Sequence, residues 1–207
     1  MALPARNYRI SRRDWLLAGL AIPLFRARAN EQLSISFDGD NLHVAAPGLH
    51  FLAGKPLSRL KDADTVTFLS QLTLFSDPFV TVVKRAPERI VVSYDLWEER
   101  FAVTILSASK RTQSGLTVAQ AEAWTIDNLA ISSLGVPRDR PFWLRFELRT
   151  ASQKELSRVV GESGISLGGL VEFFSRKPTS DDPYWTRSAG PLRLADLPRT
   201  LARGRIG

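Results

Sequence analysis

Apolar and polar residues alternate with a period of two through much of the central part of the chain. In Phe142–Arg149 every second residue is Phe or Leu, and the residues between them are one tryptophan and three charged side chains. Successive side chains of a β-strand point to opposite faces. This alternation therefore predicts a half-buried strand with a charged outer face.

Six further segments carry the same strand signal. They are residues 32–37, 42–46, 65–75, 79–85, 90–96 and 101–106. The turn-forming residues Asp38–Asn41 predict a hairpin between the first two segments. A second turn, at Ala86–Arg89, is expected to end the fourth segment before the fifth begins. Four segments between residues 65 and 106, separated by short turns, favour an antiparallel meander.

Capping boxes, in which Ser or Thr is followed three residues later by Glu or Gln, mark two helix starts. One box begins a helix predicted over Thr117–Leu129, and the other, at Ser152, begins a short helix through Val160. A third helix is predicted over Ile165–Ser175, because four apolar residues recur there at the spacings i, i+3, i+4 and i+7. These residues are Leu167, Leu170, Val171 and Phe174.

The chain is therefore predicted to be mainly β, with α+β as the alternative. We expect an antiparallel sheet or a two-layer β-sandwich of seven or eight strands, with two or three helices packed on it. Residues 30–178 contain no visible repeat or linker and predict a single β-rich domain. Residues 179–207 hold five arginines and little periodicity, and they predict an irregular C-terminal arm.

Residues 1–29 have the order of features found in an export signal. Arg12 and Arg13 are followed by Trp15 and Leu16, and this run resembles the twin-arginine consensus. The resemblance implies two partners, the twin-arginine export machinery and signal peptidase. It also implies that the protein is periplasmic or secreted.

The rest of the leader fits cleavage better than anchoring. Its apolar stretch, residues 15–25, is 11 residues long, whereas a helix needs about 20 to cross a bilayer. We therefore expect no stable transmembrane anchor. Ala27 and Ala29 supply the small residues of a signal-peptidase site, so the mature chain is expected to begin at Asn30.

The leader also accounts for most of the basic charge. The whole chain has a net charge of +7, and residues 1–29 contribute +5 through six arginines and one aspartate. The remaining 22 basic and 20 acidic residues leave only +2, which gives no support for a nucleic-acid partner. The chain has no cysteine, so disulfides, thiolate metal sites and cysteine nucleophiles are excluded.

Candidate chemistry is sparse. His43 and His50 match no metal-ligand spacing, and we interpret them as unrelated histidines. Ser107 and Lys110 have the spacing of a serine–lysine nucleophile motif, but its companion motifs are absent. The Asp38–Asn41 segment could offer oxygens to calcium, although a hairpin turn explains it more economically. We predict no catalytic residue, no cofactor and no metal.

Three hypotheses for function follow. The first is a non-enzymatic envelope protein, a binding or assembly module with an envelope protein as its partner. The alternative is a periplasmic hydrolase or cell-wall enzyme with an atypical carboxylate site, for which Asp95, Glu98 and Glu99 are the nearest cluster in sequence. The third is a helper that docks onto a membrane complex through an exposed apolar patch on the helix at 165–174.

Hydrophobic placement over residues 54–149 resembles an uncharacterised family of short exported bacterial proteins, a domain of unknown function. The segments that carry this resemblance are Gly54–Leu57, Val66–Phe75, Arg89–Tyr94, Arg100–Val103, Thr117–Leu129 and Phe142–Leu148. The chain departs from the family in its twin-arginine leader and in the stretch Gly161–Pro178, where the family implies a short link to the last strand. The resemblance implies no active-site residues.

Overall fold

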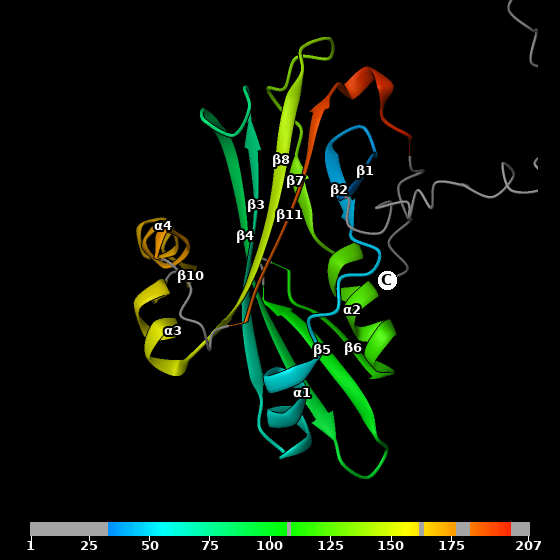
Figure 1. Ribbon diagram of the computed structural model, residues 1–207, viewed down its shortest axis with the longest axis vertical. Helices are drawn as coiled ribbons and strands as arrows, with labels where there is room; N and C mark the ends of the chain where they lie inside the picture. Colours follow the sequence, from blue (N-terminus) through cyan, green and yellow to red (C-terminus); the bar gives the residue numbers. More distant parts are fainter. Residues whose placement is uncertain (1–32, 107–108, 162–163, 177–182, 200–207) are drawn as a thin grey trace, which may run out of the picture.

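The computed structural model describes residues 33–106, 109–161, 164–176 and 183–199 of the chain (Figure 1). The leader predicted at residues 1–29, with its export and cleavage residues, lies outside the described residues, as does Ser107. The described residues form two larger antiparallel sheets, a two-stranded ribbon and four α-helices. The prediction of a mainly β chain with packed helices is therefore confirmed.

The larger sheet has six strands in the order β11-β8-β3-β4-β5-β6, and every neighbouring pair is antiparallel (Figure 1). Its strands are β3 (Val66–Phe75), β4 (Val82–Asp95), β5 (Arg100–Leu106), β6 (Arg111–Leu116), β8 (Phe142–Ala151) and β11 (Tyr184–Leu192). Strands β3 to β6 follow one another along the sheet as an antiparallel meander. Three of them, β3 to β5, lie in the region where a meander of four strands was predicted, and β6 was not predicted. The later strand β8 adds beside β3, and β11 adds beside β8.

The smaller sheet has the order β1-β2-β7, formed by β1 (Ser34–Phe37), β2 (Asn41–Ala45) and β7 (Ala130–Ser132). Its first two strands pair as the predicted hairpin, with Phe37 opposite Leu42 across the turn. The short strand β7 was not predicted, because three residues are too few to show a period. A two-stranded ribbon, β9 (Val160–Gly161) and β10 (Gly164–Ile165), lies elsewhere in the chain.

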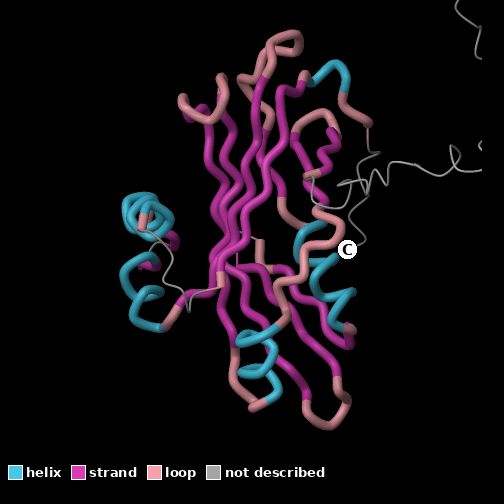
Figure 2. Tube along the Cα trace, viewed as in Figure 1, coloured by secondary structure: helices cyan, strands magenta, loops and turns pink. Residues whose placement is uncertain are grey.

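The two faces of the large sheet are covered by different elements (Figures 1 and 2). One face packs against the small sheet, α1 (Gly54–Lys61) and α2 (Val118–Asp127), and it holds the main core. The other packs against α3 (Gln153–Val159) and α4 (Leu167–Ser175) around a second, smaller cluster. That cluster consists of Leu69, Ala151, Leu156, Val159, Leu170 and Phe173. Strand β3 is therefore buried on both faces.

The prediction of two strands separated by a turn at Ala86–Arg89 is wrong, because strand β4 spans both segments and the expected turn. It runs unbroken through Pro87, which pairs with Gln71 of β3. On its other side β4 pairs with β5 only from Arg89 onward. The proline therefore lies in the half of β4 where β3 is the only strand neighbour among the described residues, and there a missing N–H is tolerated.

The prediction of an irregular arm after residue 178 is wrong for residues 184–192, which form strand β11. Tyr184–Leu192 pairs with β8, and a register shift separates Ala189 from Leu192. Trp185 packs on the main core. A short 3-10 helix, Leu194–Asp196, follows. Strand β6 was not predicted, because it is a mostly exposed edge strand whose polar residues show no alternation with apolar ones.

Both capping boxes form as predicted. At the start of α2, Gln120 N–H donates to Thr117 Oγ1 at 3.3 Å and Thr117 N–H donates to Gln120 Oε1 at 2.9 Å. At the start of α3, Ser152 N–H donates to Glu155 Oε2 at 2.8 Å, and Ser152 Oγ accepts from Glu155 N–H. Each box satisfies N–H groups that the first helical turn leaves unpaired.

Helix α4 forms where it was predicted, but its buried face is rotated. Leu170 and Phe173 are buried, whereas Val171 is 39% exposed. The close approach of α3 explains the rotation, because a Cβ at Gly169 would lie only 2.6 Å from the carbonyl oxygen of Arg158. The buried apolar residues of α4 therefore pack within the protein, in the smaller core cluster. No helix among the described residues has the length and apolarity needed to cross a bilayer.

The prediction of a charged outer face on β8 is wrong at Arg149, whose side chain is buried. The residue is 7% exposed, and its guanidinium lies 4.4 Å from the centre of the Tyr184 ring. Its Nη atoms donate to three carbonyl groups at the end of α4, those of Phe173, Phe174 and Arg176. The last carbonyls of a helix lack partners within the helix, so a cation placed there is stabilised. Arg149 thus joins α4 to the sheet.

Candidate binding groove

A cavity lies between α2 and the segment that follows β2. Its volume is about 460 Å³. The lining residues come from β1, the end of β2, the loop after it and one face of α2: Ser34, Ala45, Ala46, Pro47, Gly48, Leu49, His50, Ala119, Glu122, Ala123, Ile126 and Asp127. We call this cavity the binding groove. Small and apolar side chains dominate its walls, as in many ligand sites.

Local sequence explains both walls of the binding groove. On α2, the lining residues recur at spacings of three and four from Ala119 to Asp127, which places them on one side of the helix. The opposite wall is a tight turn in which Leu49 N–H donates to the carbonyl of Ala46 at 3.1 Å. Gly48 within that turn has φ +76°, a conformation that favours glycine.

A buried carboxylate joins the two walls. Glu122 is 4% exposed, and its Oε1 accepts from the backbone N–H of Leu52 at 2.8 Å. Its Oε2 lies 3.0 Å from Nδ1 of His50. A carboxylate taken out of water needs such donors to offset its lost hydration. Glu122 therefore fixes the loop between β2 and α1 against α2.

The histidine of this pair faces the solvent. The His50 side chain is 73% exposed, whereas that of Glu122 is only 5% exposed. With the carboxylate oxygen as the acceptor, Nδ1 of His50 carries the hydrogen, and Nε2 has a lone pair in the neutral ring. Nε2 has no hydrogen-bond partner among the described residues. The pair thus presents an oriented imidazole at the edge of the binding groove.

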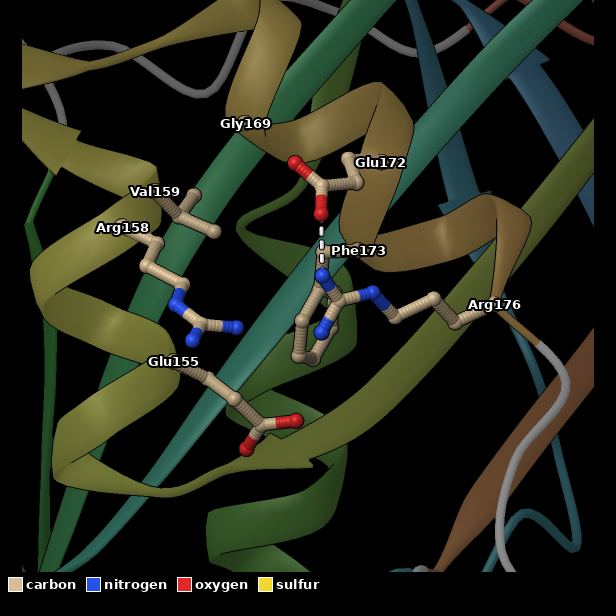
Figure 3. Close-up of a pocket in the computed structure, with 7 residues that line it drawn as sticks. All are labelled: Glu155, Arg158, Val159, Gly169, Glu172, Phe173 and Arg176. Carbon is tan, nitrogen blue, oxygen red and sulfur yellow. Dashed lines mark hydrogen bonds and ion pairs between the residues drawn. The ribbon is translucent and has the colours of Figure 1, made fainter.

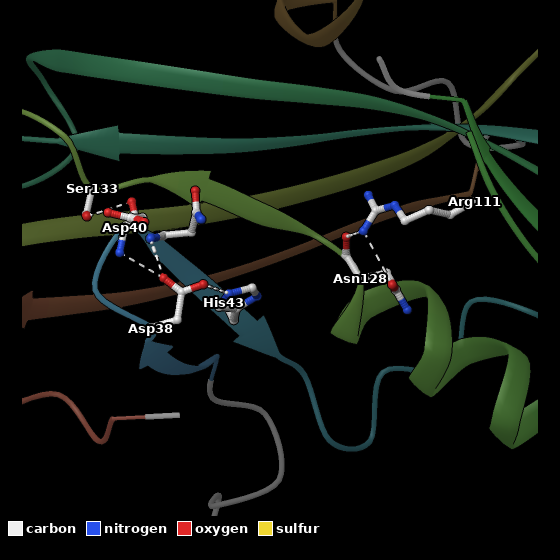
Figure 4. Close-up of polar contacts among 7 residues, drawn as sticks. Asp38, Asp40, His43, Arg111, Asn128 and Ser133 are labelled. Carbon is white, nitrogen blue, oxygen red and sulfur yellow. Dashed lines mark hydrogen bonds and ion pairs between the residues drawn. The ribbon is translucent and has the colours of Figure 1, made fainter. Parts of the chain in front are cut away.

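The other histidine belongs to a separate pair (Figure 4). His43 Nε2 lies 2.7 Å from Asp38 Oδ2, and Asp38 Oδ1 accepts from the backbone N–H groups of Asp40 and Asn41. The hydrogen bond with His43 is the main reason that the pKa of Asp38 is held well below its usual range. The predicted turn is confirmed, and the two histidines contact different carboxylates.

Arg111 and Glu88 form a further polar cluster beside α2. Arg111 Nη1 donates to the carbonyl of Asn128 at 2.7 Å, which fixes the end of α2 to β6 (Figure 4). Glu88 Oε1 lies 4.0 Å from Nη2 of Arg111. Burial raises the pKa of Glu88, and the charge of Arg111 partly offsets that rise. This cluster holds secondary structure together and does not line the binding groove.

The carboxylates considered for a hydrolase are not assembled into a cleft. Asp95, Glu98 and Glu99 are all exposed at the turn between β4 and β5. Asp95 Oδ1 accepts from the N–H groups of Trp97 at 2.8 Å and Glu98 at 3.0 Å, so it stabilises its own turn. The sequence cluster that motivated the hydrolase alternative therefore has a structural explanation.

A second pocket lies between α3 and α4 (Figure 3). Its volume is about 10 Å³, and a cavity of that size holds about one water molecule. Glu172 and Arg176, one helical turn apart, pair with each other on its rim. This pocket is too small to be a ligand site.

Sequence reasoning missed Glu122 although it predicted the helix that carries it. A signal was present, because Glu122 shares a helical side with Ala119 and Ile126 of the apolar face. A charged residue on such a face indicates a buried partner. That partner, the backbone N–H of Leu52, lies 70 residues away in the sequence.

No protein-family model, curated protein or solved structure matches the chain. The resemblance to a family of exported proteins over residues 54–149 therefore stays a prediction. The properties of the binding groove have to be inferred from its own residues.

Proposed function

We propose that the chain is an exported envelope protein whose β-rich domain is a non-enzymatic binding module. The observation that carries this proposal is the binding groove, in which hydrogen bonds hold Glu122 and His50 in one geometry beside mostly apolar walls. Ligand sites commonly combine apolar walls with a few positioned polar groups. Most of the net charge that would suggest a nucleic-acid partner belongs to the leader.

The groove favours a ligand with an apolar body and a hydrogen-bond donor or a positive charge. Its charged lining residues are Glu122 and Asp127, and neither lysine nor arginine lines it among the described residues. Neutral His50 accepts a hydrogen bond through Nε2. Binding is favoured over turnover for the following reason. A catalytic nucleophile such as a hydroxyl group needs a hydrogen bond to a base such as His50, and no described hydroxyl is hydrogen-bonded to His50.

Filling the groove should abolish binding of a cationic amphiphile. Dansylcadaverine joins an aromatic body to a primary ammonium, and we expect its fluorescence to rise when it binds the protein. Ala123, an exposed groove residue, should be replaced by tryptophan (Ala123→Trp). Loss of the buried aromatic contact is expected to weaken the affinity at least about tenfold. Fluorescence titration measures this change.

Ala195→Trp is the matched control, because Ala195 is an exposed alanine outside the groove. It should bind the probe as the unaltered protein does. Equal affinities for all three proteins, including the Ala123 variant, would show that the groove is not the ligand site. Thermal unfolding of each variant verifies that the fold is intact.

The export half of the proposal has its own test. Replacing Arg12 and Arg13 together by lysine should leave the uncut chain in the cytoplasm, because the arginine pair is the address that the export receptor recognises. Cell fractionation followed by immunoblotting measures the location and the size of the chain. Replacing Arg6 and Arg9 by lysine is the control and should leave export unchanged. Normal processing of the Arg12/Arg13 variant would overturn the assignment of the route.

A further inference from the structure

Three loops meet at one end of the large sheet, the upper end in Figure 1. They are residues 76–85 around the β3–β4 turn, residues 133–145 between β7 and β8 with the first residues of β8, and residues 190–196 at the end of β11. We call these three segments the basic tip. Lys84 Nζ donates to the carbonyl of Leu134 at 3.1 Å, which links the first two segments. Ala195 N–H donates to the carbonyl of Arg138, which links the third.

The basic tip exposes large apolar side chains. Val80 is 78% exposed and Leu134 is 81% exposed, and Val83 lies close by at 45%. The turn that carries Val80 is well defined, because Asp77 Oδ1 accepts from the N–H groups of Val80 and Thr81. Exposed apolar groups on a fixed turn indicate a contact surface more strongly than scattered ones do.

Basic residues lie in the same three segments as these apolar side chains. The basic residues of the tip are Lys84, Arg85, Arg138, Arg140, Arg145 and Arg193. Against these six stand three acidic residues, Asp77, Asp139 and Asp196, so the tip has a net charge of +3. The guanidinium of Arg145 lies 5.2 Å from the centre of the Phe75 ring and 4.9 Å from that of Phe79. Arg145 is thus held beside the apolar turn.

The β4–β5 turn, at the opposite end of the sheet, differs in charge. The β4–β5 turn exposes Leu96 and Trp97, the latter at 96%. Its neighbours from Asp95 to Arg100 include three acidic residues and one basic residue, a net charge of −2. The basic tip and the β4–β5 turn therefore both expose apolar side chains, but the tip has a positive net charge and the β4–β5 turn a negative one. That combination is typical of proteins that lie on an anionic membrane surface.

We propose that the basic tip docks on the surface of an anionic phospholipid bilayer. Val80 and Leu134 enter the headgroup region, and the surrounding arginines and Lys84 contact lipid phosphates. The other apolar end, around Trp97, remains in solution because its carboxylates are repelled by the same surface. This surface is separate from the binding groove, so the proposal does not depend on the groove's ligand.

The test is sedimentation of the purified protein with vesicles. Vesicles of phosphatidylcholine with about 30% phosphatidylglycerol should bind the protein, and vesicles of phosphatidylcholine alone should bind it much less. Val80→Asp combined with Leu134→Asp should weaken binding to the anionic vesicles at least about tenfold. Every variant carries the same N-terminus, so any contribution of that segment to binding is equal in all of them.

Leu96→Asp combined with Trp97→Asp is the matched control, because these side chains are also exposed and lie at the other end. This control should bind anionic vesicles as the unaltered protein does. A separate variant, Arg138→Gln with Arg140→Gln, leaves the apolar residues in place and should reduce the preference for anionic over neutral vesicles. Three results would each overturn the proposal: equal binding to both kinds of vesicle, full binding by the Val80/Leu134 variant, or loss confined to the Leu96/Trp97 variant. Thermal unfolding verifies that each variant is folded.

Discussion

Replacing Arg149 by methionine is expected to lower the free energy of unfolding by about 3 kcal/mol. Methionine keeps much of the apolar volume of the arginine stem but donates no hydrogen bond. The variant therefore loses the three bonds to carbonyls at the end of α4, of 2.8 to 3.1 Å. It also loses the cation that lies over the Tyr184 ring. Urea denaturation measures the loss, and hydrogen exchange should show α4 losing protection first.

Arg145→Met is the control for this prediction, because Arg145 lies on the same strand and on the same face. Its guanidinium contacts aromatic rings, and no hydrogen bond joins it to a helix end among the described residues. We expect it to cost less than about 1 kcal/mol. Arg149→Lys should fall between the two, since one ammonium replaces a planar group that spans three carbonyls. Equal losses at Arg145 and Arg149 would contradict the role given to Arg149.

Elements with local signals could be predicted from the sequence. The hairpin from β1 to β2 follows from alternation and a turn cluster, and both capping boxes lie within four consecutive residues. Each of these signals involves groups that are near one another in the chain, so neighbouring residues alone carry the information. The main outline of the fold, strands with a few packed helices, therefore followed.

Features that depend on distant partners could not be predicted. Pro87 indicates a turn when read locally, yet it lies within β4 because β5 pairs only with the other half of that strand. Arg149 belongs to an alternating strand whose charged residues are expected to face solvent. Helix α4 covers it, and the acceptors of its guanidinium lie 24 to 27 residues later in the sequence. In both cases a tertiary neighbour decides the outcome.

The functional predictions also divide into those with a local sequence signal and those that depend on distant residues. The prediction of an export leader rests on consecutive residues of the sequence, and it stays a prediction. The binding groove joins a loop and a helix through Glu122 and His50, which are 72 residues apart. No spacing rule connects them, because the contact depends on how α2 packs beside β2. A ligand site of this kind becomes visible only once the sheet and the helix are placed together.

Replacing Glu122 by alanine is expected to lower the free energy of unfolding by about 3 kcal/mol. The carboxylate is almost completely buried, and it is the acceptor for the backbone N–H of Leu52. Removing it leaves that donor without a partner beside two core residues, Phe51 and Leu52, which are at most 1% exposed. It also creates a cavity between the loop and α2. Urea denaturation measures the loss, and dansylcadaverine affinity should fall with it.

A substitution of His50, the exposed partner of Glu122, is the matched comparison for this prediction. His50→Ala should change stability by less than about 0.5 kcal/mol, because a substitution at an exposed position removes little packing. It should nevertheless weaken dansylcadaverine binding, since the acceptor at Nε2 is gone. Glu122→Gln should retain most of the stability, as its amide oxygen can still accept from Leu52. Two results would contradict this division between a structural carboxylate and a ligand-facing imidazole: a large stability loss in the His50 variant, or unchanged probe affinity when it is folded.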